Sequence, residues 1–171
     1  MSDDSTMDYM RGHMDESADE RPTIQSNVRA FHAMIGDIDP AFPFVPTNDI
    51  IRLRARLITE EYFETMRSLY RSDVIAESRI SRAHELLQDT IADSSPDVDL
   101  PELADGLADM AYVIEGTFQA FGIDSAPVHA LVHAANMAKR GGPVVDGKQR
   151  KPAGWVAPDV AGELERQGSG R

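Results

Sequence analysis

The sequence predicts an all-α fold, a helical bundle of about five helices. Five segments carry apolar residues at helical spacing, and capping residues, glycines or prolines stand at their ends. No segment alternates apolar and polar residues with the period of two that is typical of strands. Helices without strands bury their apolar faces against one another, so a bundle is expected.

The first helix is expected over 26–35, where apolar residues recur at i, i+3, i+4 and i+7, with Gly36 as its stop. Segment 39–46 holds three prolines and is expected to be an extended connector, because proline disrupts a helix interior. The second helix is expected to begin at the cap cluster 47–49 and to carry an apolar face over about twenty residues.

A third, more polar helix is expected over about 73–92. The fourth is expected over 100–121, since proline is tolerated in its first turn and a glycine follows its end. The fifth is expected over 125–139. The chain from 141 to 158 should be loop-like, with at most a short hairpin around Asp146-Gly147.

These elements divide the chain into three parts. Residues 1–25 are acidic and show neither helical nor strand period, which predicts a disordered tail. Residues 26–160 are expected to form the all-α domain, and residues 161–171 a C-terminal tail.

Composition excludes several classes of protein. The chain has 171 residues and a net charge of −12, which disfavours binding to nucleic acid or to an acidic membrane surface. It contains no cysteine, so disulfides, thiolate metal sites and cysteine nucleophiles are excluded. No apolar run approaches the roughly 20 residues of a membrane helix, and the polar, acidic start is not a secretory signal. We therefore expect a cytoplasmic protein.

Three glutamates crowd one region of the second helix. Glu60 and Glu64 are four residues apart, and Glu61 lies three residues before Glu64, so the three are neighbours on the helix surface. Arg56 and Arg67 stand only at the flanks. The cluster is explained either by a solvated acidic face or by a cation site.

The fourth helix favours the cation site. Glu102, Asp105 and Asp109 form a stripe beside its apolar face. Carboxylates from two facing helices can converge on a hard cation such as magnesium, which also takes phosphate oxygens from a substrate. Zinc is less favoured, because the i, i+4 pair His129 and His133 is the only arrangement that suits it and is more typical of packing.

A basic cluster follows the fifth helix; we call residues 139–151 the basic arm. Its local charge is +4 in an acidic chain, and its glycines permit bending. The arm is explained either by a solvated loop or by a segment that closes over phosphates. No Walker loop, GxGxxG or GxSxG motif is present. The cations are Lys139, Arg140, Lys148, Arg150 and Lys151.

The ordered motifs resemble one family. Segment 60–64 (EEYFE) is similar to the EExxE motif of the all-α nucleoside triphosphate pyrophosphohydrolases, which include MazG-like proteins, phosphoribosyl-ATP pyrophosphohydrolases and dimeric dUTPases. Segment 107–117 (LADMAYVIEGT) resembles the second metal helix of that family. Segments 132–139 (VHAANMAK), 146–148 (DGK) and 151–155 (KPAGW) resemble the C-terminal signature of a branch with MazG-like proteins from bacteria and phages.

The resemblance implies a metal site and its ligands. It implies magnesium, with manganese as a substitute, on Glu61 and Glu64, while Glu60 orients the attacking water or binds a further metal. Asp109 matches the aspartate of the family's ExxD motif. Gly106 stands where that motif has glutamate, and Asp105 is the candidate to replace it. A register that reads 102–105 as ExxD is the alternative.

The resemblance also implies substrate contacts and a reaction. Asn136, Lys139 and Lys148 resemble phosphate and sugar contacts of the family, with Lys151 in the same basic arm. Tyr112, which lies near Asp109 in the second metal helix, is a further candidate for binding the substrate. Trp155 either stacks on the base or packs the arm down. The implied reaction is attack of water at the α-phosphorus, which gives a nucleoside monophosphate and pyrophosphate.

Several alternatives stay open. The first choice of substrate is dUTP or a related pyrimidine nucleotide, and the second is a purine such as dGTP or GTP in a phage with modified DNA bases. A non-catalytic nucleotide-binding helical dimer is the alternative to an enzyme. The long apolar faces, like the resemblance, predict a homodimer or a homotetramer.

Overall fold

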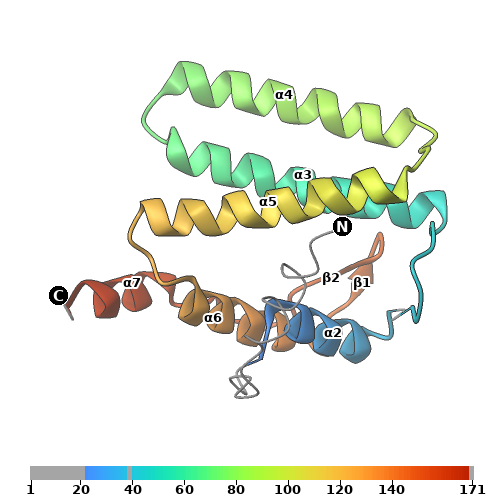
Figure 1. Cartoon of the computed structure of the whole chain (residues 1–171). Coiled ribbons are helices and arrows are strands. Elements are labelled where there is room, and N and C mark those ends of the chain that lie inside the picture. Colours follow the sequence, from blue (N-terminus) through green and yellow to red (C-terminus); the bar gives the residue numbers. More distant parts are fainter. Residues whose placement is uncertain (1–21, 38–39, 170–171) are drawn as a thin grey trace, which may run out of the picture.

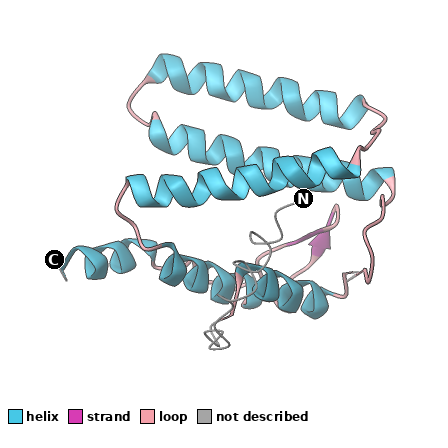
Figure 2. Ribbon diagram, viewed as in Figure 1, coloured by secondary structure: helices cyan, strands magenta, loops and turns pink. Residues whose placement is uncertain are grey.

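The structure is a computed structural model that describes residues 22–37 and 40–169. Within these ranges the regular structure is helical apart from one two-stranded hairpin (Figure 2), so the all-α prediction is confirmed. The helices are α2 (Ile24–Ile35), α3 (Asn48–Leu69), α4 (Val74–Asp93), α5 (Leu100–Ala120), α6 (Ser125–Met137) and α7 (Val160–Ser169). The strands are β1 (Val144–Val145) and β2 (Lys148–Gln149).

The helices form two groups: α3 packs against α4, and α2 and α7 both pack against α6, while α5 is drawn between the two groups in Figure 1. Helices α3 and α4 form the most extensive helix pair, an antiparallel hairpin. Phe63 of α3, only 8% exposed, stacks on the ring of His84 of α4 with centroids 4.8 Å apart. Asp73 caps α4 by accepting from the backbone N–H groups of Ile75 and Ala76.

The hairpin connects the two groups. Asp146 and Gly147 form its turn with φ of 50° and 75°, the left-handed backbone that a two-residue hairpin turn requires. Val145 pairs with Lys148 in the antiparallel register. The turn touches α3, where a Cβ on Gly147 would lie 2.8 Å from the side chain of Leu53. The hairpin predicted around residues 146–147 is therefore present.

Two helices extend into the predicted tails. Helix α2 begins at Ile24, inside the predicted tail 1–25, because Thr23 caps it by accepting from the backbone N–H of Ser26. The rest of that tail, residues 1–21, lies outside the described residues. Residues 161–169 of the predicted C-terminal tail belong to α7, which makes a sixth helix in the described chain.

Helix α7 is short but docked by specific polar contacts. The side chain of Gln167 accepts a hydrogen bond from the backbone N–H of Asp124 and donates one to its carbonyl, at 2.8 and 3.0 Å. Glu163, 3% exposed, accepts a hydrogen bond from Gln167 and pairs with Arg166. The bonds between Gln167 and Asp124 join residues 43 positions apart, so the periodicity of the segment itself gives little sign of them.

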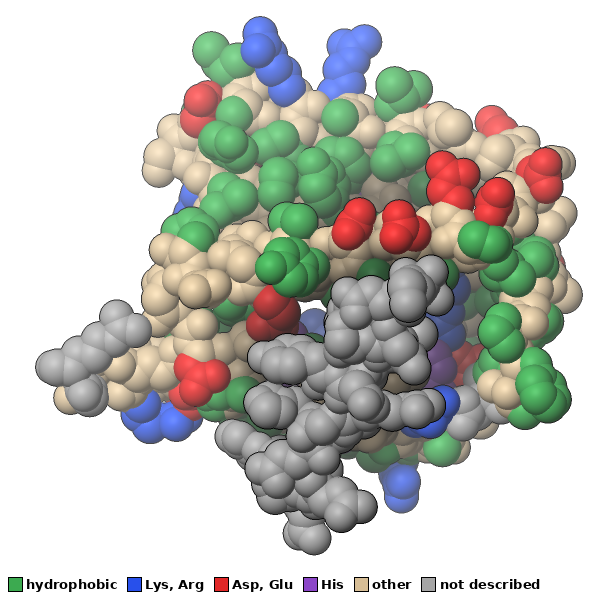
Figure 3. All heavy atoms as spheres, viewed as in Figure 1, with side chains coloured by type: hydrophobic (Ala, Val, Ile, Leu, Met, Phe, Trp, Pro, Cys, Tyr) green, Lys and Arg blue, Asp and Glu red, His purple; other side chains and the backbone are tan. Residues whose placement is uncertain are grey.

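Helix α5 is exposed along most of its length. Figure 3 shows hydrophobic side chains gathered over α4 and α5 on one face of the molecule. Apolar side chains gathered on one face are typical of a surface that contacts a partner. Exposed large apolar side chains of α5 are Leu103, Leu107, Met110, Val113 and Ile114. No helix in the described part of the chain is long and apolar enough to cross a membrane.

Candidate active site

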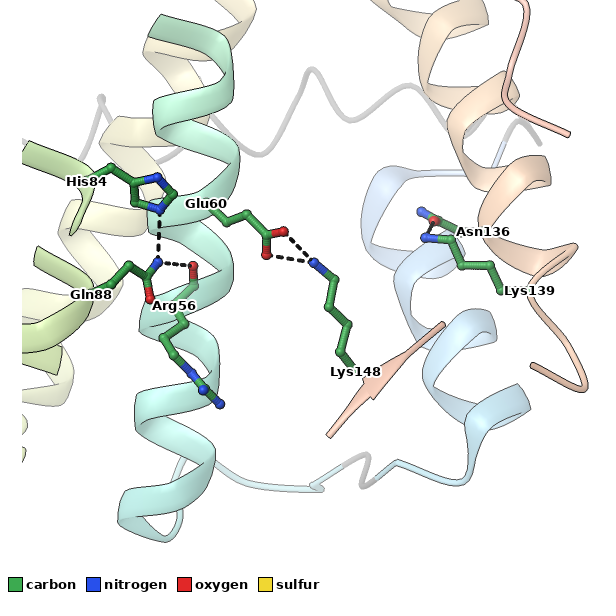
Figure 4. A network of polar contacts seen from close by, with 7 residues as sticks. All are labelled: Arg56, Glu60, His84, Gln88, Asn136, Lys139 and Lys148. Carbon is green, nitrogen blue, oxygen red and sulfur yellow. Dashed lines mark hydrogen bonds and ion pairs between the residues drawn. The ribbon is translucent and has the colours of Figure 1, made fainter. Parts of the chain in front are cut away.

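A half-buried ion pair brings the basic arm to the glutamate cluster of α3 (Figure 4). The ammonium of Lys148 lies 2.6 and 2.8 Å from the two carboxylate oxygens of Glu60. The side chains are 30% and 37% exposed, respectively. Because Lys148 directly follows the hairpin turn, the left-handed turn is what places this cation against α3.

Two further lysines stand near the same cluster. Burial lowers the pKa of Lys139, and the charges of Lys151 and then Lys148 lower it further, while Glu61 acts in the opposite direction. Lys139 donates to the side-chain oxygen of Asn136 at 2.7 Å. Lys139, Lys148 and Lys151 repel one another electrostatically. A bound anion such as phosphate would relieve this repulsion.

Side chains that bond to backbone carbonyls tie the chain after the arm to α6 and hold the arm together internally. The indole N–H of Trp155 donates to the carbonyl of Ala135 at 2.8 Å, and the ammonium of Lys151 lies 4.3 Å from the centre of the Trp155 ring. Gln149 donates to the carbonyls of Lys139 and Gly142. Of the two roles predicted for Trp155, packing the arm down is the one this geometry displays.

Behind Glu60 lies a polar network that the sequence did not reveal. The ring nitrogens of His84 lie 3.1 Å from the amide of Gln88 and 3.5 Å from the guanidinium of Arg67. Gln88 also donates to the backbone carbonyl of Arg56 at 3.5 Å (Figure 4). The i, i+4 spacing of His84 and Gln88 is the only sequence signal that points to this face of α4.

The four predicted metal ligands do not gather in the single chain. Glu61 and Glu64 project from α3, and Asp105 and Asp109 from α5, all four as exposed residues. In the described ranges, no three Asp, Glu or His residues are arranged to hold a metal ion. The four carboxylates therefore do not converge within the single chain, and their role as metal ligands stays a prediction. Carboxylate oxygens suit magnesium chemically, but the residues as they lie do not form a magnesium site.

Tyr112 lies apart from the lysines. It is 82% exposed and lines a cavity of about 630 Å³ where α5 passes into α6. In that cavity Glu115 accepts a hydrogen bond from Ser125 at 2.7 Å and pairs with His129 at 3.0 Å. The Ser125 hydrogen bond is the main cause that lowers the pKa of Glu115, followed by His129. No lysine lines this cavity.

The chain was then compared with known proteins. Residues 28–136, which run from α2 to α6, match the family model of phosphoribosyl-ATP pyrophosphohydrolase. The whole basic arm, residues 139–151, lies outside that match. A comparison with curated proteins gave no match.

The fold is shared with a solved structure. The crystal structure of a candidate NTP pyrophosphohydrolase from Exiguobacterium sp. 255-15 superimposes with a TM-score of 0.65 at 23% identity. The alignment covers 88% of this chain and 99% of that one. At this identity the likeness establishes the fold alone.

The family match carries the assignment, since it spans more than half of the chain. It also supports the predicted class of enzyme, a hydrolase that acts on nucleoside triphosphates. The chain belongs to the phosphoribosyl-ATP pyrophosphohydrolase family of all-α nucleotide pyrophosphohydrolases.

Proposed function

We propose that the protein hydrolyses a nucleoside or deoxynucleoside triphosphate to the monophosphate and pyrophosphate, with Mg²⁺ as cofactor and Mn²⁺ as a substitute. The observation that carries this proposal is the contact of Lys148 with Glu60. It joins a carboxylate of the helix that resembles the EExxE motif to a segment with three lysines. Cleavage of a phosphoric anhydride requires a carboxylate that can act on water and cations that bind the phosphates, and both are present here.

The ion pair also suggests how the chain prepares Glu60. With the ammonium of Lys148 hydrogen-bonded to both of its oxygens, the Glu60 carboxylate has no oxygen left to hold a water molecule. A triphosphate competes for Lys148, because its oxygens carry more charge than one carboxylate. Once Lys148 turns to the phosphate, Glu60 is free to accept a proton from the water that attacks the α-phosphorus.

The other predicted side chains fall into two groups. Lys139, held by Asn136, and Lys151, held over Trp155, are placed to stabilise the leaving pyrophosphate. Asn136 and Trp155 then act chiefly by positioning these lysines. Tyr112 lines a separate cavity, so in the single chain we assign it no contact with the phosphates.

The proposed metal dependence rests on the chemistry of unpaired carboxylates. Neither Glu61 nor Glu64 makes an ion pair within the described chain, and magnesium, when bound, would neutralise part of the triphosphate charge. Asp105 and Asp109 of α5 are also without ion-pair partners in the described residues. Because these four do not gather in one chain, we route no step of the reaction through the metal.

We propose a homodimer or homotetramer, without nucleic acid or membrane as partner. The exposed apolar side chains of α5 include Leu107 at 43% and Val113 at 65%, and a second copy would cover them. Light scattering on a gel-filtration column should give a multiple of 18.8 kDa. The Leu107→Asp variant should shift that mass toward one chain, and a wild-type monomer would contradict the proposal.

A second candidate function is nucleotide binding without turnover. The absence of a three-ligand metal group among the described residues favours it. For the enzyme, dUTP or a related pyrimidine nucleotide is the proposed substrate, and dGTP or GTP of a phage with modified DNA bases the alternative.

Product analysis tests both functions. The wild type, Glu61→Gln and the control Glu85→Gln are incubated with each common NTP and dNTP, including dUTP, in Mg²⁺, Mn²⁺ or chelator. Glu85 lies on α4, is exposed and pairs with no cation in the described chain. We expect monophosphate and pyrophosphate from the wild type and the control, and none from Glu61→Gln or in chelator. Diphosphate and phosphate would refute attack at the α-phosphorus, and nucleotide binding without any product would establish the second candidate.

A further inference from the structure

A second cavity of about 540 Å³ lies beside the Glu60–Lys148 pair. Its size is in the range of small-molecule sites. Its walls come from the first half of α3, the last turn of α4 and the hairpin turn. The lining residues are Asp49, Ile50, Arg52, Leu53, Arg56, Ala92, Asp146 and Gly147.

The cavity and the ion pair share two walls. Arg56 lies four residues before Glu60, so both stand on one side of α3, one helical turn apart. Gly147 lines the cavity, and the next residue is Lys148. In Figure 4 the side chains of Arg56 and Glu60 both leave α3 on the side that faces the strand of Lys148. A molecule in the cavity would thus adjoin Lys148 and Glu60.

The two arginines of the cavity differ in their bonds. Arg52 donates to the carbonyl of Ser94 at 2.9 and 3.1 Å and to Asp49 at 3.3 Å, which ties α3 to the end of α4. The guanidinium of Arg56 makes no hydrogen bond or ion pair with any described residue. Its nearest acidic neighbour on the helix, Glu60, is occupied by Lys148. The N–H groups of the Arg56 guanidinium are therefore available to bind an anionic ligand.

We propose that this cavity holds the nucleoside end of the nucleotide, with Arg56 bound to the phosphate next to the sugar. Ile50, Leu53 and Ala92 supply an apolar surface for the planar base. The carboxylate of Asp146, which has no partner among the described residues, can accept hydrogen bonds from a sugar hydroxyl or a base N–H. The inference rests on the proposed function and adds the direction in which the substrate lies.

That direction agrees with the proposed chemistry. With the nucleoside beside Arg56 and the distal phosphates at the lysines, the bond between the α- and β-phosphates lies next to Glu60. The planar guanidinium of Arg56 suits bidentate bonds to a phosphate, which a lysine reproduces only in part. Arg56 should therefore govern affinity for the monophosphate, while the lysines govern affinity for pyrophosphate.

Calorimetric binding to the full chain tests the assignment. The probes are dUMP, the four common deoxynucleoside monophosphates and inorganic pyrophosphate. The variants are Arg56→Ala, Arg56→Lys and Ala92→Leu, which fills the cavity. Arg82→Ala is the control, because Arg82 is an exposed arginine of α4 with no ion-pair partner in the described chain. Circular dichroism verifies that each variant is folded.

We expect Arg56→Ala and Ala92→Leu to weaken monophosphate binding about tenfold or more, as loss of a charge-assisted hydrogen bond implies. The monophosphate affinity of Arg56→Lys should lie between those of the wild type and Arg56→Ala. The pyrophosphate affinity of all three variants should stay within twofold of the wild type. Unchanged monophosphate binding in Arg56→Ala, an equal loss of pyrophosphate binding, or a wild type that binds no monophosphate would each overturn the inference. Product analysis on the same wild-type protein decides the proposed function independently.

Discussion

Replacing Trp155 with phenylalanine should loosen the end of the basic arm by about 1.5 kcal/mol. The indole N–H donates to the carbonyl of Ala135 at 2.8 Å, and this carbonyl lies in the last turn of α6, where helix carbonyls lack a regular helical partner. A hydrogen bond of this kind contributes about 1 kcal/mol. Lys151 lies 4.3 Å from the ring centre, and a phenyl ring would retain only part of that contact, a loss of about 0.5 kcal/mol.

Limited proteolysis measures this opening directly. When opening is fast relative to cleavage, the rate follows the population of the open form, so 1.5 kcal/mol gives about a tenfold faster cut. Trypsin sites after Lys148 and Arg150 report on the arm, and sites after Arg79 and Arg82 in α4 report on the rest of the fold.

The control variant is Tyr70→Phe, because Tyr70 is 50% exposed and its hydroxyl bonds to no described residue. Cleavage in α4 should be unchanged in both variants. A Trp155→Phe protein whose arm is cut less than twice as fast as wild type would show that the indole does not hold the arm.

Three further predictions follow from other contacts. Phe63→Ala should lower the free energy of unfolding by about 3 kcal/mol, because it removes the ring that stacks between α3 and α4, and urea unfolding should show the lower midpoint; an unchanged midpoint would contradict this packing. Pyrophosphate should restore the lowered pKa of Lys139 toward its usual value, so binding at about pH 9 should take up protons, measured as buffer-dependent heats; release of protons would refute it. Ser125→Ala should raise the pKa of Glu115 in a carboxyl NMR titration. The stability that Glu115 contributes is present above its unfolded pKa and lost as pH falls through its lowered folded pKa, so this variant should lose part of it; an unmoved titration would exclude the hydrogen bond as the cause.

Local sequence signals were sufficient for α2 to α6 and for the hairpin. Gly36 ends α2 with a φ of 74°, and the Asp146-Gly147 dipeptide forms the expected turn. These features depend on a few neighbouring residues, so a single sequence reveals them. Helix α7 was missed for two reasons. Gly162 lowers the helix propensity of the segment, and Gln167 docks the helix by contacts with a distant part of the chain.

In the candidate site too, local sequence predicted the residue types, while their meeting depends on how the helices pack. Placing Lys148 and Glu60 in one site required the resemblance to a family, since nothing local links a turn to a helix 88 positions away. The roles assigned to Glu61, Glu64, Asp105 and Asp109 stay predictions, and their expected meeting is not found in one chain. Helix spacing places carboxylates on a face, but the neighbour of that face is decided by packing of whole helices.

The separation of Glu60 and Lys148 has a consequence for the order of folding. A contact across 88 positions closes a long loop, and such contacts are entropically costly until the intervening helices are in place. During synthesis α3 leaves the ribosome well before Lys148, so its glutamates at first repel one another without a compensating cation. The ammonium joins only after α6 has set the start of the hairpin. A chain that ends before Lys148 would therefore lack the cation that pairs with Glu60, and its three glutamates would keep this repulsion.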